Sequence, residues 1–115
     1  MKKNILAIIP ARGGSKGIPK KNLKILAGKP LIYYTIQAAR ESKYINSIVV
    51  STDDEDIFHI SESFDVEVIK RPENLSRDDS PTIDVIFHVL EQSKIRVHKP
   101  NIVVLLQPTS PLRTS

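Results

Sequence analysis

A short and almost continuous apolar run near the start of the chain, residues 4–10, places the strongest constraint on the fold. It ends in a proline and leads into a glycine-rich loop, which is the pattern of a strand buried on both faces of a parallel sheet. We expect it to be the first and central strand. Further apolar or β-branched runs at residues 47–51, 66–69 and 101–106 predict three more strands.

Helical patterns separate these runs. Pro30 suits the first turn of one helix, the spacing from Thr52 to Glu55 is that of a capping box, and Ser80 followed by Pro81 is a third start signal. The residues expected on the buried faces of the three helices are Leu31, Tyr34, Thr35, Ala38 and Ala39; Ile57, Ile60 and Phe64; and Ile83, Ile86, Phe87 and Leu90.

Alternation of strands and helices along the whole chain predicts an α/β fold, doubly wound, with a mostly parallel sheet and helices on both faces. In such sheets ligands bind beyond the carboxyl ends of the strands, near the point where the strand order reverses. The loops after Pro10, Ser51, Ile69 and Leu106 are therefore the expected binding edge.

Composition narrows the class of protein. With 40% hydrophobic and 26% charged residues, the 115-residue chain is expected to fold as one globular domain, and no run reaches membrane-spanning length. The lack of cysteines excludes disulfide scaffolds and thiol chemistry and is compatible with a cytoplasmic location. The net charge of +4 favours anionic partners, and no acidic residue occurs between Met1 and Arg40.

The loop from Pro10 to Asn22 carries the clearest chemical signal. Gly13, Gly14 and Gly17 allow positive φ angles and exposed amides, which suit phosphate, and Arg12 and Lys21 flank the turn as cations for a triphosphate. The loop is neither a Walker A motif nor a dinucleotide fingerprint. A basic surface turn is the alternative on loop chemistry alone.

This loop, from Ala11 to Asn22, resembles the signature of the CMP-sialic acid synthetases, also called acylneuraminate cytidylyltransferases. Segments 51–54, 71–76, 79–84 and 105–113 resemble further family segments in the same order. The resemblance implies a Rossmann-like nucleotidyltransferase, with residues 1–115 as the nucleotide-binding part of a single domain whose C-terminal part is missing.

The resemblance also implies roles for individual residues. Arg12 and Lys21 are expected to contact the CTP phosphates and to act in catalysis, and Asn22 and Arg71 to read the cytosine ring. The other implied contacts are Gly13, Gly14, Ser15, Lys16 and Ser80 for the nucleotide, and Gln107, Thr109 and Ser110 for the sugar. Without the family, Arg71 is a solvated loop arginine, Ser80 a helix cap, and Thr109 and Ser110 turn residues.

The implied reaction transfers CMP from CTP to the anomeric hydroxyl of a nonulosonic acid and releases pyrophosphate. The resemblance implies Mg²⁺ with acidic ligands outside this chain, and a homodimer for the full-length protein. Asp53, Asp54 and Asp56 are interpreted as helix-start residues rather than metal ligands, and no metal site is assigned within the chain.

Other functions remain as alternatives. Related enzymes activate legionaminic, pseudaminic or Kdo-type acids, or attach nucleotides to sugar phosphates. A non-catalytic nucleotide-binding module, or an inactive fragment, is the alternative from another class. Nucleic acid is disfavoured as a partner because no aromatic platform accompanies the basic residues.

Overall fold

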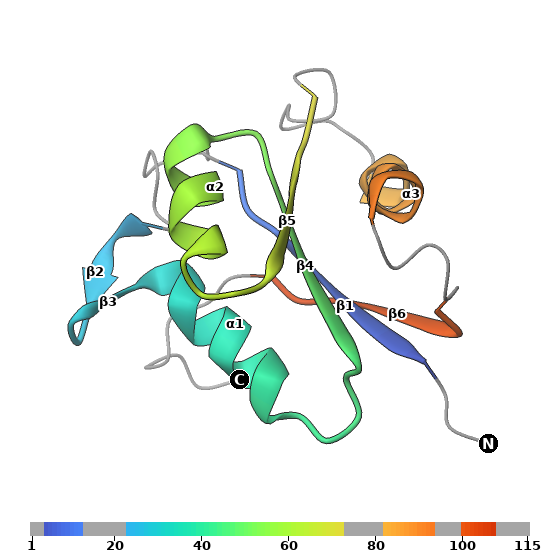
Figure 1. Cartoon of the computed structure of the whole chain (residues 1–115), viewed down its shortest axis with the longest axis horizontal. Helices are drawn as coiled ribbons and strands as arrows, with labels where there is room; N and C mark the ends of the chain where they lie inside the picture. Colours follow the sequence, from blue (N-terminus) through green and yellow to red (C-terminus); the bar gives the residue numbers. More distant parts are fainter. Residues whose placement is uncertain (1–3, 13–22, 73–81, 94–99, 108–115) are drawn as a thin grey trace.

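Four parallel strands form the central sheet of the computed structural model, which describes residues 4–12, 23–72, 82–93 and 100–107 (Figure 1). The strands are β1 (Ile5–Pro10), β4 (Ser47–Thr52), β5 (Glu67–Lys70) and β6 (Ile102–Leu105). Their order is β5-β4-β1-β6, so the first strand is central, as predicted. The strand order reverses between β1 and β6, where a doubly wound sheet has its switch point.

Helices cover both faces of this sheet. They are α1 (Leu31–Glu41), α2 (Glu55–Glu62) and α3 (Thr82–Gln92). Residues from α1 and α2 share one buried cluster with β1 and β4, whereas Val89 of α3 belongs to a second cluster with Leu6, Ile8 and Val49. Side chains that alternate along β1 and β4 thus enter different clusters, which confirms the predicted α/β fold with helices on both faces. None of the helices in the described segments has the length and apolar character needed to cross a bilayer.

The buried faces of α1 and α2 differ in part from the predicted ones. In α1 the buried residues include Ile32 and Ile36, and the predicted Ala38 is exposed. In α2 Ile57 is fully buried as expected, but Ile60 is 37% exposed. Apolar residues occur on more than one side of these helices, and the sheet determines which side is covered.

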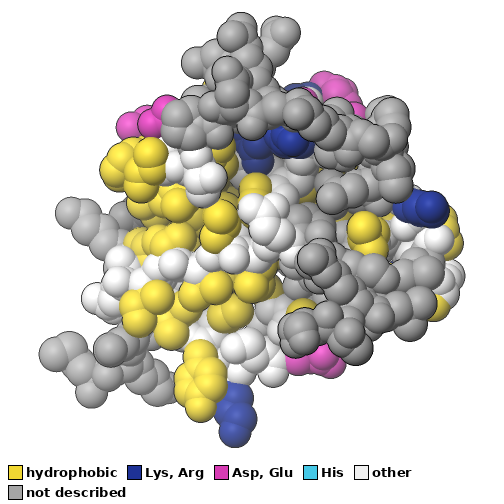
Figure 2. All heavy atoms as spheres, turned by 180° about the vertical axis from the view of Figure 1, so that it is seen from behind, with side chains coloured by type: hydrophobic (Ala, Val, Ile, Leu, Met, Phe, Trp, Pro, Cys, Tyr) yellow, Lys and Arg dark blue, Asp and Glu magenta, His cyan; other side chains and the backbone are white. Residues whose placement is uncertain are grey.

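The predicted stripe on α3 is confirmed only in part, because apolar residues again occur on more than one side of the helix. Ile83 and Phe87 are 53% and 56% exposed, whereas Val85 and Val89 are buried. The predicted Ile86 and Leu90 do pack against the core, although only partly buried. Hydrophobic side chains gather at the surface on the face shown in Figure 2.

Helix α2 starts two residues later than the predicted capping box. Thr52 is the last residue of β4, and its Oγ1 accepts a hydrogen bond from the backbone N–H of Asp54 at 3.1 Å. Asp54 is the N-cap, and its Oδ1 accepts from the N–H of Ile57 at 3.0 Å. The strand extends through Thr52 because its backbone continues the pairing with β5, opposite Lys70.

A small hairpin precedes α1 and was not predicted. Strands β2 (Ile25–Leu26) and β3 (Lys29–Pro30) are antiparallel, and the turn between them has positive φ angles at Ala27 (50°) and Gly28 (84°). Two positive φ angles in a two-residue connection are typical of a type I′ turn. Pro30 consequently ends β3 and is the N-cap of α1, instead of lying in its first turn.

Candidate functional site

The carboxyl ends of the strands form a shared edge. Pairing in register places Pro10 beside Ser51 and Ser51 beside Ile69, so the segments after β1, β4 and β5 begin at the same level. Arg12 follows β1 and is half-buried, and Gln107 follows β6 and is exposed. These two predicted site residues therefore flank the switch point of the sheet.

Arg71 lies directly after β5 and is the most unusual side chain at this edge. Only 4% of it is exposed. Its Nε donates a hydrogen bond to Ser51 Oγ at 3.2 Å, and its Nη2 donates to the Ser51 carbonyl at 3.1 Å. The interpretation of Arg71 as a solvated loop arginine is therefore wrong.

Burial and two neighbouring charges shift the pKa of the Arg71 guanidinium. Burial lowers the pKa of its guanidinium from the ordinary value, the positive charge of Arg12 lowers it further, and the charge of Asp53 raises it. Two predicted site arginines thus lie close enough to repel each other. With the carboxylate of Asp53 included, the three side chains still carry a net positive charge, which favours an anionic or acceptor-rich ligand.

Buried backbone groups hold the segments together. The N–H of Ala11 donates to the Ser51 carbonyl at 2.8 Å, and the N–H of Arg71 donates to the Thr52 carbonyl at 2.6 Å. Ser51 and Thr52 are both fully buried. The end of β4 is therefore bonded to the residue before Arg12 and to Arg71 itself.

Ser51 has no predicted role of its own, and Thr52 is predicted only as the start of a capping box. A signal for them does exist, because two hydroxyl residues end an otherwise apolar strand at the expected binding edge. A buried hydroxyl group requires a hydrogen-bond partner, and the structure supplies the partners, namely Arg71 and the N–H of Asp54.

The remaining predicted site residues lie outside the described segments. They are Gly13, Gly14, Ser15, Lys16, Lys21, Asn22, Ser80, Thr109 and Ser110. Their roles stay predictions, and so does the contact of Arg12 and Arg71 with a nucleotide.

A magnesium ion needs several oxygen ligands, usually including carboxylates. Within the described part of the chain, no group of three or more His, Cys, Asp or Glu side chains could hold a metal ion. Asp54 caps α2 and Asp56 lies in its first turn. The described residues therefore do not fit a magnesium site, and the prediction that the ligands lie elsewhere stays a prediction.

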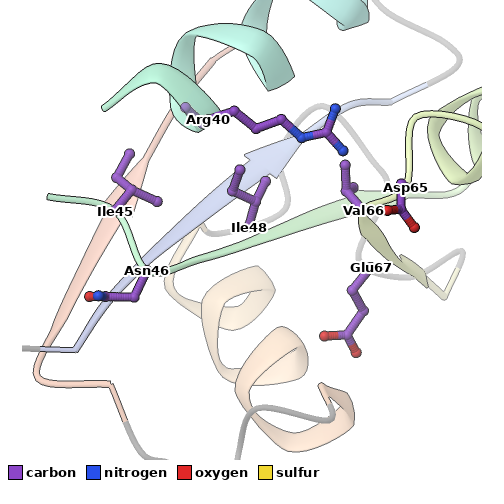
Figure 3. Close-up of a pocket in the computed structure, with 8 residues that line it drawn as sticks. Arg40, Ile45, Asn46, Ile48, Asp65, Val66 and Glu67 are labelled. Carbon is purple, nitrogen blue, oxygen red and sulfur yellow. The ribbon is translucent and has the colours of Figure 1, made fainter. Parts of the chain in front are cut away.

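A cavity of about 310 Å³ lies at the opposite edge of the sheet (Figure 3). It is lined by residues at the end of α1 and at the amino ends of β4 and β5, including Arg40, Asn46 and Glu67. Arg40 Nη2 donates a hydrogen bond to the Phe64 carbonyl there. Because this cavity lies at the amino ends of the strands, it is separate from the predicted nucleotide site.

The parallel sheet with helices on both faces and a switch point between β1 and β6 defines a Rossmann-like α/β domain. The profile of the family described as Cytidylyltransferase matches residues 6–114. The chain belongs to the cytidylyltransferase family.

Relatives of this chain carry closely related names. It is 43% identical, over its whole length, to the N-acylneuraminate cytidylyltransferase of Escherichia coli O18:K1:H7, and covers 26% of that protein. It is 44% identical to the CMP-N,N'-diacetyllegionaminic acid synthase of Legionella pneumophila over 95% of this chain and 47% of that protein. The chain thus spans between a quarter and a half of the length of these relatives.

Solved structures support the fold. CMP:2-keto-3-deoxy-manno-octonic acid synthetase complexed with CTP matches 96% of this chain and 42% of its own chain, with a TM-score of 0.78 and 24% sequence identity. A cytidylyltransferase from Leptospira borgpetersenii matches with a TM-score of 0.68 and 22% identity. At these identities the likeness establishes the architecture alone.

Proposed function

We propose that residues 1–115 are the nucleotide-binding part of a single cytidylyltransferase domain, and that the enzyme transfers CMP from CTP to the anomeric hydroxyl of a sialic-acid-type sugar. The anomeric oxygen bonds to the α-phosphorus, the bond from that phosphorus to the pyrophosphate oxygen breaks, and the hydroxyl proton is released. The observation that carries this proposal is the buried guanidinium of Arg71, held at the carboxyl edge near Arg12 in a chain of this family.

The proposed roles follow from the family resemblance and from the charge of the side chains. Arg12 and Lys21 hold the phosphates and neutralise the charge that develops on pyrophosphate, with Gly13, Gly14, Ser15 and Lys16 around them. Arg71 and Asn22 donate to the O2 and N3 acceptors of cytosine. Ser80 lies near the nucleotide. Gln107, Thr109 and Ser110 begin the sugar pocket.

We also propose that Mg²⁺ assists the transfer and that its carboxylate ligands lie outside this chain. When bound, the ion supplies Lewis-acid stabilisation of the phosphate oxygens. A cytoplasmic location and a homodimer for the complete protein belong to the same proposal, and both come from the family resemblance.

Two acids compete as the sugar substrate. The E. coli relative is named for N-acylneuraminate and the Legionella relative for diacetyllegionaminic acid, with nearly equal identities to this chain. Both are nonulosonic acids, which supports the class of substrate. A non-catalytic nucleotide-binding module is the competing function.

Binding and turnover separate these functions. Calorimetry should detect CTP binding to this chain, with weaker binding of GTP. Arg71→Met should lower the CTP affinity about 10- to 100-fold, which corresponds to one or two charged hydrogen bonds. Arg40→Met is the matched control, since Arg40 lies at the opposite edge of the sheet. Equal binding of CTP by Arg71→Met and the wild type would contradict the proposed site.

Pyrophosphate release should then be assayed with CTP, Mg²⁺ and each of N-acetylneuraminic, legionaminic and Kdo acids. We expect turnover by a form as long as the relatives, and little by residues 1–115 alone. Efficient release by the short chain would show that the metal ligands are not missing from it. CTP binding without turnover by the long form would favour the non-catalytic module.

A further inference from the structure

Ser51 presents two oxygen atoms to one edge of the Arg71 guanidinium. Its Oγ accepts from Nε at 3.2 Å and its carbonyl oxygen accepts from Nη2 at 3.1 Å. Nε and Nη2 form the side-on edge of the planar guanidinium group, and two contacts along one edge fix the orientation of the plane. Ser51 therefore constrains the direction of the opposite edge, which carries Nη1.

Both contacts are made to neutral oxygens. A carboxylate in the same place would orient the guanidinium but would also neutralise it, whereas a hydroxyl and a peptide carbonyl orient it and leave its positive charge in place. The charge of Arg71 is largely shielded from water, because only 4% of the residue is exposed. Burial strengthens the hydrogen bonds that this guanidinium makes with an acceptor or anionic group.

The burial of Ser51 keeps its hydroxyl in contact with Arg71 Nε. The residue is fully buried, so water cannot take the place of the Oγ. Its carbonyl also accepts from the N–H of Ala11 at 2.8 Å, which ties it to the segment that carries Arg12. Removal of the hydroxyl would leave Nη2 on the carbonyl but take away this partner of Nε, which loosens the hold of Ser51 on the guanidinium plane.

We propose that Ser51 is the positioning residue that aims Arg71 at the base of the bound nucleotide and so sets base selectivity. This inference rests on the proposed function. Cytosine and uracil share the O2 acceptor, but N3 is an acceptor in cytosine and a donor in uracil. A guanidinium held at a fixed angle therefore favours CTP over UTP, and a rotating one discriminates less.

The test compares two buried serines. Ser51→Ala removes the hydroxyl that contacts Arg71, and Ser61→Ala removes a fully buried hydroxyl in α2 for which no hydrogen-bond partner is found. We expect Ser51→Ala to lower CTP affinity about 10-fold with little change for UTP, which is the low end of the range for one hydrogen bond to a charged group. Ser61→Ala should leave both affinities unchanged. Urea unfolding of each variant confirms that it is folded at the temperature of the titration.

A double-mutant cycle decides whether Ser51 acts through Arg71. In an Arg71→Met background, Ser51→Ala should have no further effect on the CTP to UTP affinity ratio. Ser51→Thr, which retains the hydroxyl, should keep the ratio closer to that of the wild type than Ser51→Ala does. In NMR spectra, the Nε–H resonance of Arg71 should exchange faster with water in Ser51→Ala than in the wild type.

The outcomes separate this inference from the proposed function. The first case is a wild type that prefers CTP to UTP. If Ser51→Ala then leaves the CTP to UTP affinity ratio unchanged, or changes it equally with and without Arg71, the positioning role is wrong and the proposed function stands. If the wild type binds no CTP, the proposed function fails and the inference fails with it. A ratio that falls in Ser51→Ala alone, and recovers in Ser51→Thr, supports both.

Discussion

Helix α3 offers a direct test of which of its faces stabilises the fold. Val89 is fully buried against Leu6, Ile8 and Val49, whereas Phe87, two residues earlier, is 56% exposed. Val89→Ala removes two buried methyl groups at about 0.8 kcal/mol each. Incomplete collapse of the vacated space raises the total loss of unfolding free energy to about 2–3 kcal/mol.

The same substitution at Phe87 should cost less, although phenylalanine is the larger side chain. Phe87→Ala is expected to lower the free energy of unfolding by less than about 1 kcal/mol, because much of the ring is already in water. Residue size alone gives the opposite order, since a fully buried phenylalanine replaced by alanine costs about 3–5 kcal/mol.

Thermal unfolding followed by circular dichroism measures the difference. A chain of 115 residues has an unfolding entropy of about 0.24 kcal/mol per kelvin, so Val89→Ala should lower Tm by about 8–12 °C. Phe87→Ala should lower it by less than about 4 °C. A larger decrease for Phe87→Ala than for Val89→Ala would refute the assignment of the buried face.

Two further predictions concern the hairpin and a surface ion pair. Ala27→Asn should raise the free energy of unfolding by about 0.5–1 kcal/mol in urea denaturation, because asparagine tolerates the left-handed backbone found at Ala27 better than alanine does; a loss of stability would mean that this turn does not form. Lys70 Nζ lies 3.0 Å from Glu55 Oε1, and its hydrogen bond and charge lower the pKa of Glu55 below the ordinary 4.5. This pair should stabilise the protein above pH 4.5, and the contribution should disappear as the pH falls through the lowered pKa. The stability difference between the wild type and Lys70→Met should therefore be larger at pH 7 than at about pH 3; a difference that is the same at both would exclude the carboxylate as its source.

The sheet could be predicted from sequence because its strands are apolar on both faces. The run at residues 4–10 contains almost no polar residue and forms β1, which is paired on both sides as such a strand requires. The run at residues 101–106 is equally apolar, but it forms β6, which is partly buried at the edge of the described sheet. The sequence could not define which helix faces are buried. Apolar residues surround much of α3, so the contact with β1 and β4 decides that Val89 is buried and Phe87 is exposed.

The site was predictable in its location but not in its construction. Glycines and basic residues after the first strand pointed to the carboxyl edge, where the structure places Arg12 and Arg71. The burial of Arg71 was not visible in sequence, because it depends on Ser51 in another strand, twenty residues earlier. The hairpin was missed for a different reason: its strands have two residues each, too few to show a period.

The bonding at the end of β4 has a consequence for how sequences of this kind can diverge. Of the five hydrogen bonds described there, three are accepted by the peptide carbonyls of Ser51 and Thr52 and two by their hydroxyls. Every residue type supplies a peptide carbonyl, so substitutions in the neighbouring loops do not remove the hydrogen bonds that these carbonyls accept. Natural variation should therefore accumulate in the loops and leave a small hydroxyl residue at position 51.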